Sequence, residues 1–186
     1  MLKFPNKDSS SISKHLVKSV NIPMDLYQSM QGKYFIGYAD NLDFGKGASA
    51  WARLLNPLQS GVNLYVNVWT VSDISGIPIR AQFWFNSTPQ GTPAESLLIT
   101  PANTAIRPLH QPKIKLQYAT NVTGDPLGGI KAYARRCASE TTIVETEDGK
   151  YIFPPGGSFL VTLSAPENPD ALAAGRVAFG WWEEKV

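Results

Sequence analysis

Short segments in which apolar and polar residues alternate recur along the sequence, and they restrict its fold more than any other feature. A period of two residues places successive side chains on opposite faces of a strand, so each segment predicts a β-strand with one buried face. With similar runs at 33–39, 48–55, 127–136 and 142–153, about eight to ten strands are predicted. The clearest segments are VNLYVNVWTVS (62–72), PIRAQFWFN (78–86), KIKLQYA (113–119), FLVTL (159–163) and RVAFGWWEE (176–184).

This pattern favours an all-β fold, a two-sheet antiparallel β-sandwich of jelly-roll or Greek-key type. A chain of 186 residues fits one domain with a sizeable core. We expect that domain to span residues 21–186 and to follow an N-terminal arm, residues 1–20. Asn21 is a candidate N-cap and Pro23 suits a first helical turn, so one short helix is predicted over 22–30.

The arm contains one apolar cluster, formed by Ile12, Leu16, Val17 and Val20. Residues 12, 16 and 20 would share one face of a helix, but as even positions they would also share one face of a strand. The periodicity therefore leaves both conformations open. Two roles are also open: a free terminal tail, or an arm that docks on a neighbouring copy and adds a strand to its sheet edge.

Charge is sparse and unevenly placed along the chain. Charged residues make up 17% of the sequence, below the typical quarter, which suits a surface partly covered by another molecule. The net charge is +2. Residues 1–20 carry four lysines and one aspartate, which sum to +3, so the remainder sums to −1. Without a basic stripe to neutralise phosphates, nucleic acid is not an expected partner.

No segment predicts a membrane span or an export signal. An apolar run of about 20 residues would be needed to cross a bilayer, and the sequence has none. The first 20 residues also lack the uninterrupted apolar stretch of a signal peptide. We expect a protein that is made in the cytoplasm and has no membrane partner. A final location on a spore, virion or other surface assembly is compatible with this.

Residues that could carry catalysis or bind a metal are few and scattered. His15 and His110 have no metal-binding spacing, so both are expected to be ordinary surface residues. Cys137 is the single cysteine, and a buried or inert thiol is expected there. Asp40 and Asp43 favour a solvated turn over a Ca²⁺ site. We therefore expect no cofactor, no metal and no enzyme activity.

A second acidic group surrounds a strong turn signal. Glu145, Glu147 and Asp148 lie close together, and Asp148-Gly149 is a dipeptide typical of tight hairpin turns. The segment 142–153 therefore predicts a hairpin, with the carboxylates crowded at its tip.

Aromatic side chains are the richest chemical resource of the chain. In 62–72, alternation places Tyr65 and Trp69 on the face opposite Leu64 and Val66, and in 79–85 it places Arg80 and Trp84 opposite Phe83. If these two runs pair as a hairpin, the four residues share a face away from the core. The competing reading is that a second sheet or a loop covers this face within the same subunit. The full predicted interface or ligand platform is Tyr65, Trp69, Arg80, Trp84, Tyr133 and Trp182.

Six segments together resemble an uncharacterised family of small bacterial proteins from spore-forming Gram-positives: QGKYFIG (31–37), ASAWARLLNP (48–57), GVNLYVNVW (61–69), LGGIKAYARR (127–136), PPGGSFLVTL (154–163) and GRVAFGWWEE (175–184). The resemblance covers residues 31–184 and supplies no catalytic residue. In style the chain is also similar to jelly-roll subunits of endospore appendages and phage decoration proteins. Those appendage subunits carry cysteines in their arms and this arm has none, which argues against covalent crosslinking.

Two functions follow from these observations. The leading hypothesis is a non-enzymatic structural subunit that assembles with copies of itself into a fibre, ring or surface layer, through the arm and exposed aromatics. The alternative is a carbohydrate- or receptor-binding module whose platform would be the aromatic residues named above. Trp84 distinguishes an assembly role from a core role, because Trp84→Ala is expected to impair assembly more than folding whereas Phe83→Ala unfolds the domain.

Overall fold

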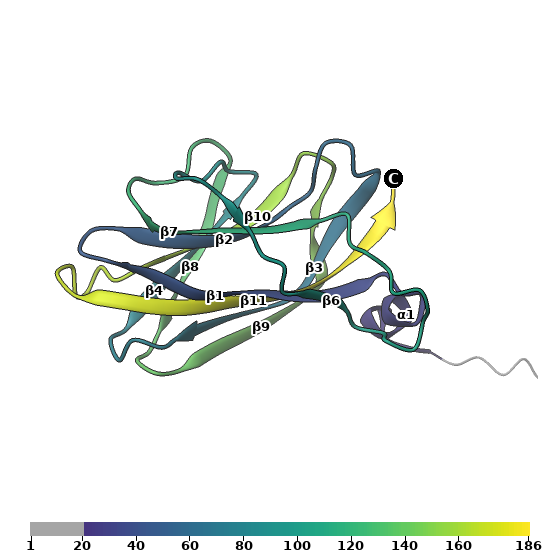
Figure 1. Ribbon diagram of the computed structural model, residues 1–186, viewed down its shortest axis with the longest axis horizontal. Coiled ribbons are helices and arrows are strands. Elements are labelled where there is room, and N and C mark those ends of the chain that lie inside the picture. Colours follow the sequence, from purple (N-terminus) through teal and green to yellow (C-terminus); the bar gives the residue numbers. More distant parts are fainter. Residues whose placement is uncertain (1–20) are drawn as a thin grey trace, which may run out of the picture.

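The computed structural model describes residues 21–186, so the predicted arm with Ile12, Leu16, Val17 and Val20, and also His15, lies outside the described residues. The described chain forms two antiparallel β-sheets packed face to face and one short helix, α1 (Met24–Met30) (Figure 1). The predicted all-β sandwich is thus confirmed. The predicted helix is confirmed too, although Pro23 occupies the N-cap position and makes no side-chain capping bond.

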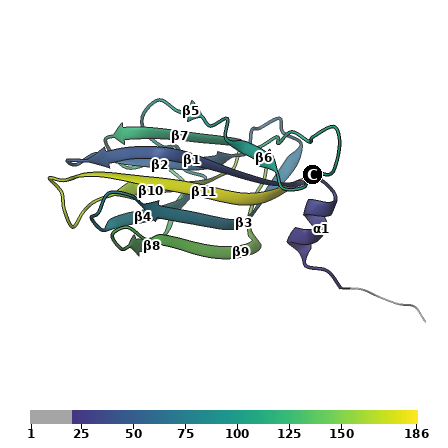
Figure 2. The ribbon, with the colours of Figure 1, turned by 60° about the horizontal axis from the view of Figure 1, so that its bottom comes forward.

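Each sheet consists of strands from distant parts of the sequence. Sheet A has the order β6 (Ile99–Pro101), β1 (Tyr34–Gly45), β11 (Leu172–Lys185), β3 (Val62–Asp73) and β9 (Thr142–Phe153). Sheet B has the order β5 (Ala94–Glu95), β7 (Lys115–Val122), β2 (Ser49–Leu55), β10 (Ser158–Ser164), β4 (Ile79–Phe85) and β8 (Ile130–Cys137). In Figure 2 the strands of the two sheets overlap in the view, and α1 lies beyond one end of the sandwich.

Most connections cross from one sheet to the other, and this overturns one prediction. The strands β3 and β4 follow each other in sequence but lie in different sheets, so they do not form a hairpin. Asp73, at the end of β3, holds the crossing loop in place. Its carboxylate accepts hydrogen bonds from the backbone N–H of Ser75 (2.9 Å) and of Glu140 (2.8 Å).

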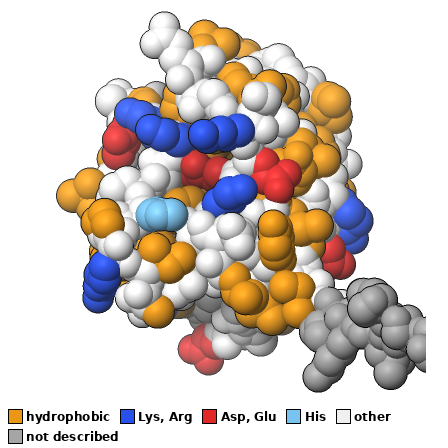
Figure 3. Space-filling view, turned by 90° about the vertical axis from the view of Figure 1, so that its right-hand side faces the viewer, with side chains coloured by type: hydrophobic (Ala, Val, Ile, Leu, Met, Phe, Trp, Pro, Cys, Tyr) orange, Lys and Arg blue, Asp and Glu red, His pale blue; other side chains and the backbone are white. Residues whose placement is uncertain are grey.

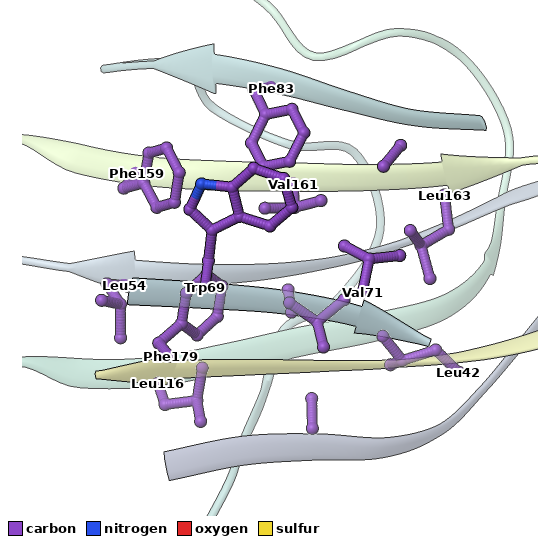
Figure 4. Close-up of a cluster of buried hydrophobic side chains, with 14 of the residues drawn as sticks. Leu42, Leu54, Trp69, Val71, Phe83, Leu116, Phe159, Val161, Leu163 and Phe179 are labelled. Atoms are coloured by element: carbon purple, nitrogen blue, oxygen red, sulfur yellow. The ribbon is translucent and has the colours of Figure 1, made fainter. Parts of the chain in front are cut away.

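The core lies between the sheets and is built by the inward side of the alternating pattern. Phe83, Phe159 and Phe179 are buried there, as alternation predicted, and Cys137 is buried among them as a free thiol. Figure 4 shows Trp69 in the middle of this core, directed at Phe83 of the opposite sheet. Their ring centroids are 4.4 Å apart.

A bulge at Asn67 reverses the alternation of β3. Val66 pairs with Trp181 and Val68 with Gly180, so Asn67 is an extra residue against β11. On the other side Val66 pairs with Tyr151 and Val68 with Thr146, so Asn67 lies opposite residues 147–150 of β9. Its side-chain amide donates to the Tyr34 hydroxyl at 2.8 Å. One inserted residue exchanges the two faces of a strand. The residues before Asn67 follow the predicted faces, and the residues after it occupy the opposite ones.

The predicted hairpin in 142–153 is wrong, because this segment is the single strand β9. Both halves of β9 pair with β3, and residues 147–150 form an excursion opposite Asn67. Asp148 (φ 51°) and Gly149 (φ 73°) adopt the left-handed backbone that the dipeptide favours. The local turn geometry was therefore predicted correctly, but it interrupts one strand and does not join two.

The predicted turn at 39–45 is also part of a strand, β1. The chain bulges between Ala39 and Leu42, with Asn41 in the left-handed region (φ 50°). Asp40 lies at the bulge and pairs with Arg176 of β11 at 2.6 Å. The hydrogen bond from Arg176 holds the pKa of this carboxyl below its usual value. The carboxylate is thus engaged by a cation from the neighbouring strand.

Candidate functional site

The structure separates the six residues predicted to form one platform into three places. Tyr65 and Trp182 lie together on the outer face of sheet A. Arg80 and Trp84 lie on the outer face of sheet B. Trp69 and Tyr133 pack on Phe83 between the sheets.

The outward orientation predicted for Trp69 is wrong, and the Asn67 bulge is the reason. Trp69 is fully buried, and its indole Nε1 donates to Oε1 of Glu147 at 3.1 Å. Glu147 is itself buried and lies on the β9 excursion, not at a hairpin tip. Trp69 therefore stabilises the contact between the two sheets.

Tyr133 lies at the edge of the core, between β8 and β9. Its ring stacks on Phe83 at 4.5 Å, and its hydroxyl donates to Glu147 at 3.5 Å. Burial raises the pKa of Tyr133, and the neighbouring Tyr151 and Glu147 raise it further. Arg135 covers the ring at 4.8 Å and is held by Glu145 at 2.6 Å. This cluster closes the open side of the sandwich.

Trp84 does point away from Phe83, as predicted, but it is only 7% exposed. It belongs to a second apolar cluster on the outer face of sheet B, with Trp51, Ala119, Val122 and Leu160. The loop between β4 and β5 and the strand β8 cover this cluster: Trp51 Nε1 donates to the carbonyl of Gln90 in that loop at 2.8 Å, and Lys131 of β8 lies 4.9 Å over the Trp84 ring. The structure thus agrees with the competing reading, a loop that covers this face within one subunit. We accordingly revise the expectation for Trp84→Ala to a loss of stability.

A small polar cavity of about 80 Å³ lies beside Trp84. Its lining includes Arg80, Lys131 and Asp125, whose carboxylate lies 4.0 Å from Lys131 Nζ, together with the hydroxyl-bearing Ser49, Thr162 and Ser164. One guanidinium nitrogen of Arg80 donates to Gln82 at 2.9 Å. Because Asp125 pairs with Lys131, the part of this surface that can accept a small acidic group is Arg80 with the neighbouring hydroxyl groups.

Tyr65 and Trp182 stack with centroids 5.4 Å apart and planes 7° apart. Tyr34 continues the stack on the other side of Trp182 at 6.5 Å. Gly149 of the β9 excursion lies against the Trp182 ring, where a Cβ atom would collide with it. Trp182 is only 4% exposed as a result. Tyr65 and Trp182, which were predicted to form part of an open platform, instead form a closed stack. This stack lies at one end of an apolar surface.

That apolar surface is a trench on the outer face of sheet A, and it was not predicted. Two rows of side chains cross the sheet: Ile36, Gly180 and Val68 in one, and Tyr38, Ala178 and Thr70 in the next. The middle strand, β11, contributes only Gly180 and Ala178, so the face is hollow between the larger side chains of β1 and β3. We name this hollow the β11 trench and define it by those six residues. The cavity volume there is about 470 Å³.

The trench is bounded on three sides. The Trp182 stack closes one end, and the Asp40–Arg176 ion pair crosses the same face beyond the other. Leu97 and Leu98, which are 91% and 47% exposed, form a rim beside β1. Within residues 21–186, none of the side chains that line the trench is charged.

The sequence contained a signal for the trench. Ala178 and Gly180 are small residues at alternate positions of β11, between the larger Arg176 and Trp182 on the same face of the strand. Gly180 is required by its surroundings, because a Cβ atom would collide with the Tyr34 hydroxyl and lie 2.7 Å from Val68 Cγ1. Recognising the trench also requires the neighbours of β11, which come from residues more than 100 positions away in the sequence.

No group of acidic, histidine or cysteine side chains in the described part of the chain is placed to hold a metal ion. His110 Nδ1 lies 2.8 Å from the carbonyl of Gly32 and helps to fix the loop next to α1. The Cys137 thiol contacts the carbonyl of Thr141 at 3.3 Å. In residues 21–186, no helix has the length and apolar character needed to cross a membrane.

Comparison with known proteins gives a family but no function. The chain matches no curated protein and no solved structure. A family match extends over residues 4–186, so it includes most of the segment predicted as an arm and is longer than the 31–184 of the resemblance. The chain belongs to DUF6143, a family of unknown function.

Proposed function

We propose that this protein is a non-enzymatic structural subunit that assembles with copies of itself into a fibre, ring or surface layer, and that the β11 trench is a contact surface of the assembly. One observation carries the proposal: two successive rows of sheet A are apolar, hollow at β11 and open to solvent. Tyr65 and Trp182, the aromatics first expected to make contacts, mark the end of this surface.

The energetics of burial support a contact role for the trench. A contiguous apolar patch on a folded chain commonly marks a protein contact. Covering this patch contributes about 25 cal/mol of favourable free energy for each Å² of apolar surface removed from water. Ile36 (45% exposed) and Leu97 (91% exposed) would supply much of that area. The absence of charge among the described lining residues avoids the cost of burying an unpaired ion.

The low charge of the whole chain, 17%, agrees with a surface that is largely covered in an assembly. The resemblance to jelly-roll subunits of endospore appendages and phage decoration proteins points in the same direction. Under this proposal the protein would be found on a spore, a virion or a comparable surface.

Sedimentation velocity of the full chain over a hundredfold range of concentration tests the proposal. We expect species larger than a monomer that grow with concentration. Ala178→Lys places a charge in the trench and should weaken association at least tenfold. Leu172→Lys is the matched control, because Leu172 is an exposed apolar residue of the same strand outside the trench. A monomer at every concentration, or equal effects of the two variants, would contradict the proposal.

A second candidate function rests on the Trp84 cavity, where Arg80 and the neighbouring hydroxyl groups favour a small acidic group such as the carboxylate of an acidic sugar. This is the glycan-binding alternative in a narrower form. Calorimetric titration with glucuronate, and with glucose as the uncharged control, tests it. We expect binding of glucuronate alone and its loss in Arg80→Gln. Heat changes that are equal for the two sugars would contradict the assignment.

A further inference from the structure

We infer that the first half of β9, residues 142–146, pairs antiparallel with the same residues of a second copy, so that the A sheets of two molecules join at their edges. This interface is distinct from the trench contact of the proposed function, because it uses backbone hydrogen bonds and has two-fold symmetry. The open backbone of the edge, the order of its side chains and the contrast with the other sheet edges support the pairing.

The backbone of β9 is open on one side. β9 is an outermost strand of sheet A, and Figure 1 shows it at the lower margin of the sandwich. Within residues 21–186, the backbone of residues 142–146 pairs with β3 and with no other segment. Alternate residues of an edge strand direct their N–H and C=O groups away from the sheet, so the strand is a template for another one. The first half of β9 can therefore accept a further strand.

The outward side chains of this segment are complementary to themselves. Thr142, Val144 and Thr146 are exposed on the outer face of sheet A, and they read the same in both directions. With a two-fold axis at Val144, valine meets valine, and each of the two threonines meets the other threonine of the partner. Threonine pairs and pairs of β-branched residues directly opposite each other stabilise an antiparallel sheet. This palindrome favours a second copy as the partner, because a two-fold contact uses the same surface on both molecules.

The single charged residue of the segment does not oppose the pairing. Glu145 points inward and is held by Arg135 of β8, with 2.6 Å between carboxylate oxygen and guanidinium nitrogen. In the two-fold pairing Glu145 lies opposite Ile143 of the second copy, so the two carboxylates do not face each other. Like charges directly opposite would destabilise the sheet. The pairing therefore brings no unpaired charges together.

The other sheet edges carry features that oppose pairing. β5 and β6 are only two and three residues long, and β6 ends at Pro101, which has no N–H to donate. β8 has eight residues, but it carries Lys131, Arg135 and Arg136 and an irregular register against β4. Short strands, cations and bulges are the means by which proteins block edge pairing. Residues 142–146 pair with β3 without a register shift and carry no cation.

The end of the molecule beside α1 presents a different kind of surface. Met24 and Met30 of α1 are exposed, and hydrophobic side chains are visible at this end (Figure 3). Acidic and basic side chains lie among them in the same view. A helix forms its backbone hydrogen bonds internally, so α1 has no strand edge to offer.

Edge pairing would bring the trenches of two copies onto one surface. Residues directly opposite each other in an antiparallel pair project to the same face, so the outer faces of both A sheets lie on one side. Val144 lies in the same row as Thr70 and Ala178 of the trench. The resulting dimer has two trenches on one face, and trench contacts would join such dimers into a larger assembly.

Disulfide crosslinking of full-chain variants tests the register. Val144→Cys would place two sulfurs next to each other, because directly opposite Cβ atoms of an antiparallel pair are about 4.5–5.5 Å apart. Ile152→Cys is the matched control, since Ile152 is similarly exposed (52% against 59%) on the same face of β9 beyond the excursion. The buried Cys137 stays in both variants. Under oxidised glutathione, the dimer linked at 144 should form at least tenfold faster than the dimer linked at 152, and equal rates would overturn the inference.

Amide hydrogen exchange measures the backbone pairing itself. The measurement uses Ala178→Lys, in which the trench contact is weakened, at two concentrations a hundredfold apart. We expect exchange of the amides in residues 142–146 to slow at least threefold at the higher concentration. The amides of β8, the neighbouring edge strand of sheet B, are the internal control and should not slow. Unchanged exchange in 142–146, or equal slowing in β8, would contradict pairing through β9.

The outcomes separate this inference from the proposed function. Ala178→Lys should still form the dimer linked through Val144→Cys but no larger species. Large assemblies that show no preference for position 144 over position 152 would overturn the pairing and leave the trench contact standing. Dimers that are no larger in the wild type than in Ala178→Lys would overturn the trench contact and leave the pairing standing. A chain that is monomeric at all concentrations overturns both.

Discussion

Replacement of Trp69 tests the most consequential difference between the sequence pattern and the fold. An outward Trp69 could be truncated at little cost to stability, whereas the structure places its indole between the sheets against Phe83 and Glu147. Truncating a buried Trp to Ala costs about 3–5 kcal/mol. A domain of this kind is stable by about 5–15 kcal/mol, so Trp69→Ala would remove a large share.

The hydrogen bond from Trp69 to Glu147 makes a separate, measurable contribution to the free energy of unfolding. Trp69→Phe keeps most of the ring but removes the N–H donor, and a hydrogen bond to a charged group contributes roughly 1.5–3 kcal/mol. In a Glu147→Gln background the same substitution should cost less, because the acceptor is no longer an ion. We expect a coupling of about 1 kcal/mol between the two substitutions.

Urea unfolding of the wild type, Trp69→Ala, Trp69→Phe, Glu147→Gln and the Phe/Gln double variant gives these free energies. In thermal melts Trp69→Ala should lower Tm by about 6–20 °C, at about 2–4 °C per kcal/mol for a chain of this length. A Trp69→Ala protein within about 1 kcal/mol of the wild type would refute the burial of Trp69 and the reversal of β3 at Asn67. If Trp69→Ala does not fold, the Trp69→Phe cycle still decides the point.

Three further results are expected. Gly149→Ala should destabilise the fold by more than Gly47→Ala in urea titrations, since both glycines have φ in the left-handed region but only Gly149 has no space for a Cβ atom; equal losses would mean that backbone strain alone matters. Burial raises the pKa of Glu183 above 4.5, so its stabilising contribution is complete below that pH and is lost as the pH rises through the folded pKa. The stability of the wild type relative to Glu183→Gln should therefore fall between pH 4 and 8, and a rise would show that the bonds from Lys113, Ile114 and Trp181 dominate. Finally, Tm should stay within about 2 °C when chelator or reductant is added, and a larger drop would reveal a metal site or an intermolecular disulfide.

Local patterns in the sequence determined most of the strands and the short helix. Phe83, Phe159 and Phe179 are buried as alternation predicted, and Trp181 and Trp182 lie on opposite faces of β11. Alternation reports which side chains share a face, and that property belongs to each strand separately. The all-β class could therefore be predicted without any knowledge of how the strands pair.

The errors have a common physical origin in contacts between distant segments. Asn67 reverses the faces of β3 because β11 has no residue opposite it, and a period of two residues cannot show such an insertion before the partner strand is known. Asp148-Gly149 has the backbone its residues prefer, but the pairing of both flanking runs with β3 makes it an excursion and not a hairpin.

The sequence by itself determined most of the strands and the short helix. Only the tertiary structure decided which aromatics reach solvent: Lys131 of β8 lies over Trp84, and the β9 excursion covers Trp182. It also created the β11 trench, because the small side chains of Ala178 and Gly180 form a hollow only between the larger side chains of β1 and β3. Burial depends on which distant segment of the chain packs over a residue, and a local sequence pattern does not show which segment that is.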